Sequence, residues 1–245
     1  MCAAGTTLAP QSQQTIIMTS DTFEMWSATH LITIGVIAVL SVLLILYGTR
    51  LQQDDRVFLG RRFGLLMLVF FIYEYTWRFC TFGFEVCVEQ EMLPLHFCAF
   101  MSLICIIALW WQKSWACSLV YFGVLSASIQ AIFTPVLKED FPSVAFINFF
   151  VSHSLLLMAA LLQIGVLKWR ARRRDPLMAL LLMDAYVLAI HPVNLWLGSN
   201  YGYTTEGPAG TILAQLGPAP WYYFWLQPAL VILFYFMYLF VRKKS

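Results

Sequence analysis

Charged residues are scarce in this sequence: Asp, Glu, Lys and Arg make up only 11% of its 245 residues. Hydrophobic residues make up 60%, and the mean hydropathy is +0.73. This composition excludes an ordinary soluble domain and is typical of an integral membrane protein. The formal net charge of +2 says little about partners, because the basic residues follow the membrane topology described below. We expect one compact helical bundle without a second globular domain.

Motifs of soluble enzymes are also missing. The chain has no Cys-x-x-Cys, no His-Glu-x-x-His and no phosphate-binding glycine loop, and we expect no metal, no cofactor and no nucleic-acid partner. Residues 1–14 lack the basic and apolar regions of a signal peptide, and no internal repeat stands out. The six cysteines fit no disulfide framework, although Cys80 and Cys87 flank the outer end of one predicted span and are a candidate pair.

Long apolar runs are what the sequence does have. Seven of them are close to the ~20 residues that a helix needs to cross a bilayer. The predicted spans are 26–48, 63–81, 93–111, 115–134, 144–167, 177–197 and 220–241. The fold class is therefore all-α and polytopic, with an N-terminal segment at 1–25, a bundle at 26–241 and a tail at 242–245. The Gly, Pro and aromatic content of the loop 198–219 predicts a folded cap over the bundle.

Basic and acidic residues lie on opposite sides of these spans. The basic side carries Arg50, Arg56, Arg61, Arg62, Lys113, the run 168–174 and Arg242 to Lys244. The other side carries Lys138 and the acidic residues Asp21, Glu24, Glu85, Glu89, Glu91, Glu139, Asp140 and Glu206. The positive-inside rule then predicts an outer N-terminus and a cytoplasmic C-terminus. We expect a multi-pass protein of the bacterial cytoplasmic membrane, or of the endoplasmic reticulum if the source is eukaryotic.

Polar side chains interrupt most predicted spans, and nearly all fall about 5–13 Å below the outer surface at 1.5 Å per helical residue. The outer layer comprises Glu74, Arg78, His96, Cys98, Gln130, His153, His191 and Asn194. Only Asp184 lies clearly deeper. Because a charge or an imidazole in hydrocarbon is expensive, a cluster at one depth indicates a site.

Structural alternatives exist for most of these residues. Glu74 and Arg78, four apart with the acid first, could form a structural ion pair, or Arg78 could bind a lipid phosphate or a carboxylate. His191 precedes Pro192, and satisfying local backbone groups is the simpler explanation for it. Three amide side chains are expected to form interhelical hydrogen bonds, namely Gln130, Asn148 and Asn194.

Cys98 and His153 are the pair with chemical potential. A thiol becomes a strong nucleophile when a neighbouring imidazole takes its proton. Both residues lie on spans that run inward from the outer face, so similar positions along the spans give similar depths. Inert packing of Cys98 as a small apolar residue is the alternative.

Five short segments occur together in an order that resembles a known family. They are LPLHFC (93–98), FFVSHS (149–154), NLWLGSNY (194–201), GPA (207–209) and LGPAPWY (216–222). Over about residues 60–240 the chain is similar to the bacterial YwaF integral-membrane family, whose animal relatives include a transmembrane phospholipid acyltransferase. The resemblance implies thiol-dependent transfer of acyl chains between phospholipids and lysophospholipids, with Cys98 as nucleophile and His153 as base. Where the family commonly has an acid after the cysteine, this chain has Ala99, and Glu74 is the candidate substitute.

Further residues complete the predicted site. Arg78 is the candidate for the head-group phosphate, and four residues are candidates for oxyanion donors or pocket walls: His96, Asn194, Asn200 and Tyr201. Water in place of the lysophospholipid would make the same site a hydrolase. A lipid or small-solute transporter is an alternative, although the polar layer is offset to one leaflet. A haem or metal protein that uses His96, His153 and His191 is a third class, which a visible spectrum would test.

Overall fold

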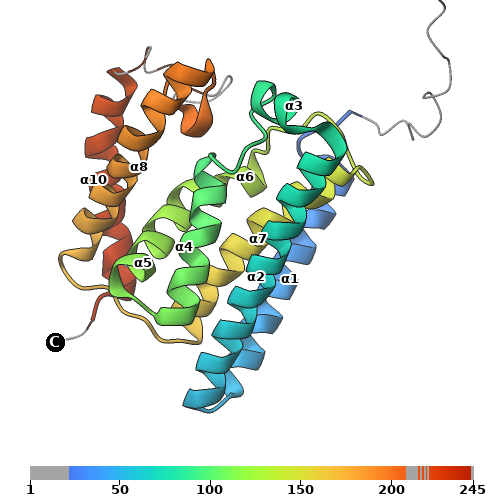
Figure 1. The fold of residues 1–245 in the computed structure, drawn as a ribbon. Helices are drawn as coiled ribbons and strands as arrows, with labels where there is room; N and C mark the ends of the chain where they lie inside the picture. Colours follow the sequence, from blue (N-terminus) through green and yellow to red (C-terminus); the bar gives the residue numbers. More distant parts are fainter. Residues whose placement is uncertain (1–21, 208–214, 216, 218, 220, 244–245) are drawn as a thin grey trace, which may run out of the picture.

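The computed structural model describes residues 22–207, 215, 217, 219 and 221–243. The chain forms helices joined by short loops (Figure 1). Their bounds are α1 (Ala28–Arg50), α2 (Gln53–Phe82), α3 (Phe84–Glu89), α4 (Phe97–Trp111), α5 (Ser114–Leu119), the π-helix η1 (Val120–Ser128), α6 (Gln130–Phe133), α7 (Val144–Gly165), α8 (Asp175–Leu197), the 3-10 helix η2 (Tyr201–Tyr203) and α10 (Trp221–Val241). The all-α prediction is confirmed. Residues 1–21 of the predicted N-terminal segment, and much of the predicted cap after residue 207, lie outside the described residues.

Within the described residues, five helical segments are long and apolar enough to cross a membrane: α1, α7, α8, α10 and the continuous run Ser114–Phe133. The other two predicted spans, 63–81 and 93–111, fall within α2 and α4. The helix α2 begins at Gln53, before the predicted span 63–81, and so extends beyond it toward α1. In this extension, Arg56 donates to the carbonyl oxygens of Leu51 (2.9 Å) and Thr49 (3.0 Å) and so satisfies the end of α1.

The predicted start of the third span at residue 93 is wrong. Residue 93 precedes Pro94, whose ring disfavours helical geometry at the residue before it, and α4 begins only at Phe97. The 15 residues of α4 therefore extend about 23 Å, less than the ~30 Å hydrocarbon core. The segment LPLHFC is thus mostly a loop that leads into the first turn of α4.

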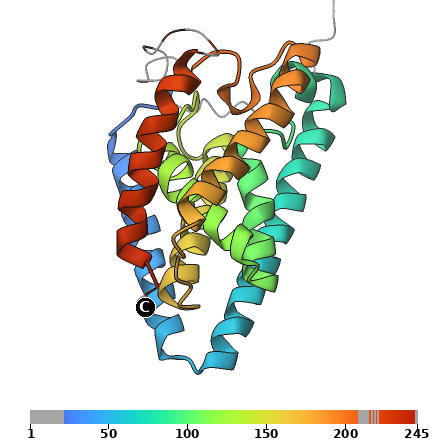
Figure 2. The ribbon, with the colours of Figure 1, turned by 90° about the vertical axis from the view of Figure 1, so that its left-hand side faces the viewer.

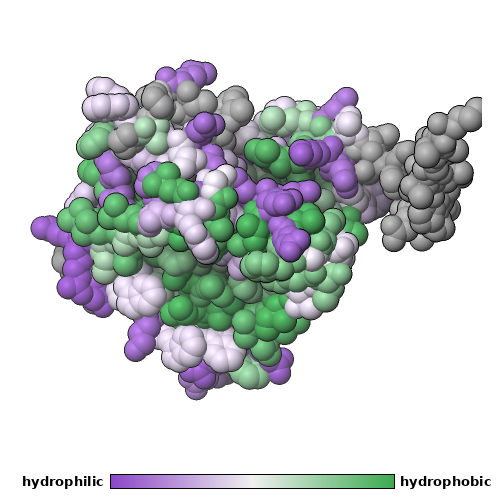
Figure 3. Space-filling view, turned by 45° about the horizontal axis from the view of Figure 1, so that its top comes forward, coloured by the Kyte–Doolittle hydropathy of each residue, from purple (hydrophilic) through white to green (hydrophobic). Residues whose placement is uncertain are grey.

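The surface of the molecule is largely apolar, and this feature fits a membrane protein. Large hydrophobic side chains point outward from α1, α2, α8 and α10, among them Leu188 (75% exposed) and Trp196 (82% exposed). Figure 3 shows broad apolar areas with hydrophilic side chains in separate groups. Such a surface would promote aggregation in water, whereas hydrocarbon solvates it.

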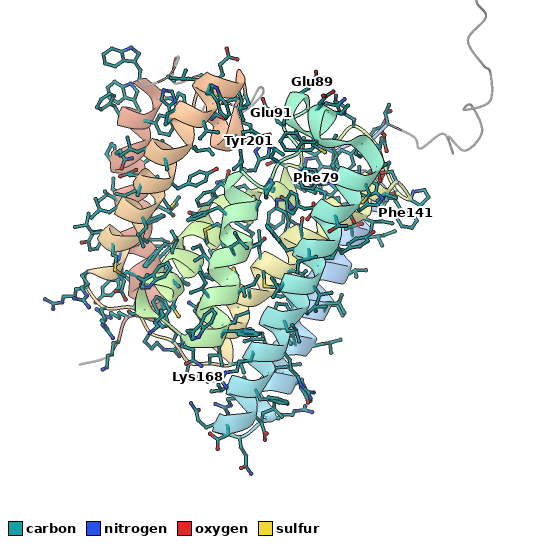
Figure 4. The ribbon with its side chains drawn as sticks, in the orientation of Figure 1. Phe79, Glu89, Glu91, Phe141, Lys168 and Tyr201 are labelled. Carbon is teal, nitrogen blue, oxygen red and sulfur yellow. The ribbon has the colours of Figure 1, made fainter. Side chains whose placement is uncertain are left out.

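The ends of the bundle differ in charge. Lys168 lies at one end, and Glu89 and Glu91 lie at the other (Figure 4). We call these the basic end and the acidic end. The turn between α1 and α2 and the end of α10 also lie at the basic end (Figure 1).

The hydrophobic core lies between α4, the α5–η1–α6 run and α7, and Figure 1 shows α4 and α5 flanked by α8 and α10 on one side and by α1 and α2 on the other; Figure 2 gives the view from the side of α8 and α10. Near the basic end, α2 approaches α4 closely at Gly64, where an added Cβ would lie 2.6 Å from Trp110 Cδ1. Toward the acidic end the ribbons of α2 and α4 diverge (Figure 1). This divergence places the predicted polar residues of the two helices at the wider end.

A histidine that the sequence analysis missed fastens α1 to the bundle. His30 is fully buried, accepts the Trp26 backbone N–H at Nδ1 (3.1 Å) and contacts the Ile132 carbonyl oxygen through Nε2 (2.9 Å). Because a carbonyl can only accept, Nε2 carries the proton. The neutral ring therefore joins the start of α1 to α6.

The candidate disulfide is wrong, since Cys80 and Cys87 are both free. The turn at Gly83 separates α2 from α3, which leaves Cys80 exposed and buries Cys87. The Cys87 thiol instead donates to the Arg78 carbonyl oxygen (3.6 Å).

Asp184, the deeper polar residue, accepts a hydrogen bond from Gln227 of α10 (2.7 Å), a typical polar contact between membrane helices.

Candidate active site

An ion pair lies on α2, in the half of the bundle nearer the acidic end, which we call the acidic half. Arg78 Nη2 lies 2.5 Å from Glu74 Oε1, as the spacing predicts, and Glu74 is only 6% exposed. Arg78 also donates through Nη1 to the Met92 carbonyl oxygen (3.3 Å), just before LPLHFC. These contacts use two of the five guanidinium N–H donors, so the residue can serve the ion pair and still offer donors to an anionic head group.

A narrow crevice lies between α2, α4 and α7. Its walls are apolar except for Glu74 of α2, Ser102 of α4 and Ser152 of α7. Its volume of about 10 Å³ is roughly the space that one water molecule occupies. Three helices thus direct polar groups into one small volume inside the acidic half of the bundle.

Cys98 stands at the start of α4, one turn before Ser102, so the two side chains share the helix face that leads to the crevice. The Cys98 thiol contacts Ser128 Oγ at 3.8 Å. Ser128 is the last residue of the π-helix η1, and π-helical turns are frequent at functional sites. The thiol therefore lies beside the end of this irregular helix, and it is half-buried.

His153 follows Ser152 on α7 and is 8% exposed. Its Nδ1 lies 2.7 Å from the Phe149 carbonyl oxygen, and the ring stacks on the Phe149 side chain at a centroid distance of 4.2 Å. Since a carbonyl oxygen only accepts, Nδ1 carries the proton in the neutral ring, and Nε2 keeps its lone pair. This tautomer is the one that a general base needs.

The thiol and the imidazole each lie next to a residue of the crevice wall, but the part of the chain that the structure describes shows no hydrogen bond between them. The thiol of Cys98 contacts Ser128, and Nδ1 of His153 contacts the Phe149 carbonyl oxygen and Ser152 Oγ (3.3 Å). Glu74 lies within electrostatic range of His153. The pairing of Cys98 with His153 stays a prediction.

The predicted residues at the end of α8 form a separate network. The Asn194 amide donates to the Tyr201 carbonyl (2.8 Å) and to Thr204 Oγ1 (2.6 Å), and its oxygen accepts from Ser199 Oγ and the Tyr201 N–H. These contacts use both amide hydrogens, so Asn194 has none left for a substrate. His191 contacts Thr204 Oγ1 (3.3 Å) rather than the backbone. The network fixes the described part of the cap.

The other predicted residues support LPLHFC and the cap. Tyr201 Oη accepts the Leu93 N–H (3.4 Å), and burial raises the pKa of this hydroxyl. Figure 4 shows Tyr201 close to Glu91, whose carboxylate accepts the Asn200 N–H (2.8 Å). His96 contacts the Glu91 carbonyl (3.0 Å) and packs edge-on against Tyr201. These residues hold the loop that precedes Cys98.

Two of the predicted interhelical amide contacts are wrong. Gln130 donates to the Ser126 carbonyl one turn earlier in its own helical run (2.8 Å), because the change from π- to α-helix leaves that oxygen accessible. Asn194 bonds to the loop after its helix and not to another span. Asn148 Nδ2 is buried without a partner among the described residues.

Long apolar helices and a largely apolar surface define the chain as a helical integral membrane protein. Among the described residues, no three His, Cys, Asp or Glu side chains gather as metal ligands. The chain belongs to the TMEM164 family, a transmembrane family whose model matches residues 25–238. No curated protein and no solved structure matches the chain. The YwaF relationship and the acyl-transfer chemistry stay predictions.

Two crevice residues, Ser102 and Ser152, and the thiol's contact Ser128 escaped the sequence analysis. Ser102 could have been found, because it lies four residues after Cys98 on the same helix face. Ser152 adjoins His153 within FFVSHS, but its direction depends on the rotation of α7. Ser128 gave no signal, since nothing in the apolar run 115–134 reveals a π-helix.

Proposed function

We propose that this protein is a membrane-embedded transferase that moves fatty acyl chains between phospholipids and lysophospholipids through a thioester on Cys98. The crevice supports this proposal most strongly: Glu74, Ser102 and Ser152 line it. Cys98 lies one helical turn before Ser102, and His153, the residue after Ser152, is a base-competent tautomer. Inert packing would not require a carboxyl group, a histidine and two serines near one thiol in hydrocarbon. The resemblance described above assigns the same two residues.

The topology is part of the proposal. We propose seven spans with the acidic end outside and the basic end in the cytoplasm, because basic side chains collect at one end of the bundle. The candidate site then lies in the outer half of the bilayer. Ester carbonyls of phospholipids lie just below the head groups, so this depth suits an attack on an ester.

The first half-reaction forms the thioester. Nε2 of His153 takes the proton of the Cys98 thiol, and the sulfur attacks the ester carbonyl of a phospholipid. A C–S bond forms and the ester C–O bond breaks. The leaving alkoxide receives the proton from His153 and departs as a lysophospholipid. Glu74 stabilises the imidazolium while it exists, and Arg78 holds the phosphate.

The second half-reaction reverses these steps with another acceptor. The hydroxyl of a second lysophospholipid gives its proton to His153 and attacks the thioester carbonyl. The new C–O bond forms, the C–S bond breaks, and Cys98 leaves as a thiolate that recovers the proton. The crevice has room for about one water beside three polar groups, so water as acceptor, which makes the protein a hydrolase, is the second candidate function.

The test is an acyl-exchange assay with purified protein in liposomes. The liposomes contain a phospholipid with an isotope-labelled acyl chain and an unlabelled lysophospholipid, and mass spectrometry follows the label. We expect Cys98→Ala and His153→Gln each to reduce transfer about 100-fold or more, as for loss of a nucleophile or a general base. A hydroxylamine-sensitive acyl adduct on the Cys98 peptide should accumulate when the acceptor is omitted.

Cys80→Ala is the matched control, because Cys80 is exposed and lies outside the crevice. It should transfer acyl chains as the unchanged protein does. Full transfer by Cys98→Ala would refute the nucleophile. Labelled free fatty acid as the main product would identify a hydrolase, and lipid movement across the bilayer without acyl exchange would identify a transporter.

A further inference from the structure

A second hollow lies on the opposite side of α4, between α4, α5 and α8. It is a groove of about 400 Å³, within the usual range of roughly 300–1,000 Å³ for small-molecule sites. Leu95, Phe100 and Leu103 line one side, and Ala185, Tyr186 and Ala189 line the other. The helix rotation from Cys98 to Phe100 places this groove away from the crevice.

The groove exists because α8 presents small side chains there. Ala185 and Ala189 are four residues apart, so they lie one above the other on the same face. The hydroxyl of Tyr186 donates to the Leu95 carbonyl (2.7 Å), so its hydrogen is already used. The groove therefore offers a ligand mainly apolar contact.

The groove opens on the lipid-facing surface. Leu103 and Trp115 at its edge are 40% and 39% exposed, and Leu181 and Leu188 of α8 beside it are 59% and 75% exposed. It extends about 12 Å along α8, from Leu182 to Ile190, at the rise of a helix. The molecules that reach such a surface inside a bilayer are lipids, and the parts that lie at this depth are acyl chains.

One end of the groove reaches the proposed site. Leu95 stands three residues before Cys98, in the loop that precedes α4. Tyr186 packs on Phe97 and Phe100 with centroid distances of 5.3 and 5.1 Å, and it lies within electrostatic range of Cys98. Leu95 and Tyr186 therefore form the end of the groove that lies nearest to the thiol.

We propose that this groove binds one fatty acyl chain of the lipid substrate, with the ester end at Leu95 and the methyl end toward Trp115. The assignment of that lipid as substrate rests on the proposed function. Ala185 and Ala189 then limit the width of the groove and so determine which acyl chains are transferred. Close packing of the chain against these side chains supplies the affinity, because lipid tails are as apolar as the groove and no water is displaced.

The experiment uses a phospholipid with a photoreactive diazirine in the middle of one acyl chain. The full-length protein is reconstituted in liposomes that contain this lipid, irradiated, digested and analysed by peptide mass spectrometry. We expect crosslinks to concentrate on residues 95–103 and 182–190. The double variant Ala185→Leu with Ala189→Leu should reduce this labelling at least fivefold, because leucine side chains fill the groove.

The matched control is Ala38→Leu with Ala229→Leu, two exposed alanines on α1 and α10. It should leave labelling of the groove unchanged. Leu103→Ala is the opposite perturbation, since it widens the groove, and it should shift acyl exchange toward bulkier chains. Equal melting temperatures for all variants exclude misfolding as the cause.

Two results overturn the inference: labelling spread evenly over all lipid-facing helices, or labelling that the Ala185 and Ala189 variant leaves intact. Either result leaves the proposed function standing if acyl exchange still depends on Cys98. Concentrated labelling in a protein without acyl exchange supports lipid binding by the groove and refutes the proposed function instead.

Discussion

Gly64 gives the sharpest test of how the bundle is assembled. An alanine Cβ there would lie 2.6 Å from Trp110 Cδ1 and 2.8 Å from Trp110 Nε1. The indole cannot move without cost, because its Nε1–H donates to the Arg61 carbonyl oxygen (2.8 Å). Gly64→Ala should therefore separate α2 from α4 or break this hydrogen bond.

The size of the effect follows from opposing contributions. Overpacking costs about 1–3 kcal/mol. Loss of the Trp110 hydrogen bond costs about 0.5–1.5 kcal/mol. Alanine regains up to about 1 kcal/mol over glycine in helix propensity. The net destabilisation is about 2 kcal/mol, which for a protein of this length lowers the melting temperature by about 4–8 °C.

Gly35→Ala on α1 is the control, because no atom lies within 4 Å of its added Cβ. It gains the helix propensity without the clash and should melt at or above the temperature of the unchanged protein. The assay is thermal unfolding of purified protein in one detergent at one scan rate. Melting of Gly64→Ala within about 1 °C of Gly35→Ala would refute the close packing of α2 on α4.

Three further predictions concern single residues. His30→Phe leaves the Trp26 N–H and the Ile132 carbonyl oxygen without their partner. The free energy of unfolding should fall by about 1–3 kcal/mol for each group, measured as a lower melting temperature, and His30→Gln should lose less. Glu74→Gln removes the charge beside His153 and should lower the turnover rate about tenfold, about 1.4 kcal/mol, with little change in KM. Burial raises the pKa of Tyr201 in the folded state, so the folded protein holds its proton to higher pH than the unfolded chain, and stability should fall as pH rises above about 10. Tyr201→Phe should flatten that decline.

Each of these predictions has a result that contradicts it. Equal melting of His30→Phe and the unchanged protein would mean that α1 is held by apolar packing alone. A Glu74→Gln variant that raises KM and keeps its turnover rate would place Glu74 in lipid binding rather than beside the imidazole. An alkaline decline of the same size in Tyr201→Phe would assign it to other groups.

The sequence predicted the helices well and their contacts less well. Hydropathy located the apolar helices because each of them must cover the bilayer by itself. The helix boundaries differ from the predicted span ends where a local interaction determines them. These places are Pro94 before α4 and Arg56 after α1. The spacing from Gly60 to Gly64 was visible in the sequence, but its partner Trp110 comes from another helix, so only the structure could identify the contact.

In the candidate site, too, contacts within one helix were predictable and most other contacts were not. The ion pair of Glu74 and Arg78 was predictable, because i, i+4 neighbours meet on any helix. The amide contacts were not, since Gln130 and Asn194 found partners close in sequence that depend on exact backbone geometry. The position of a residue along its helix can be counted from the sequence, whereas the rotation of the helix about its axis cannot.

The π-helix has a consequence for length variation in this chain. A hydrogen bond that spans five residues encloses one residue more than a bond that spans four, so η1 holds a residue that an α-helix between the same ends would exclude. Deleting one residue from η1 would let regular coiling resume between the same ends, so the helices before and after it would keep their orientation. Deleting a residue from a regular part of the run would instead turn everything beyond it by one helical step and swing Ser128 away from the sulfur. The apolar length of the segment would barely change in either case, so a count of hydrophobic residues does not reveal which position tolerates the loss.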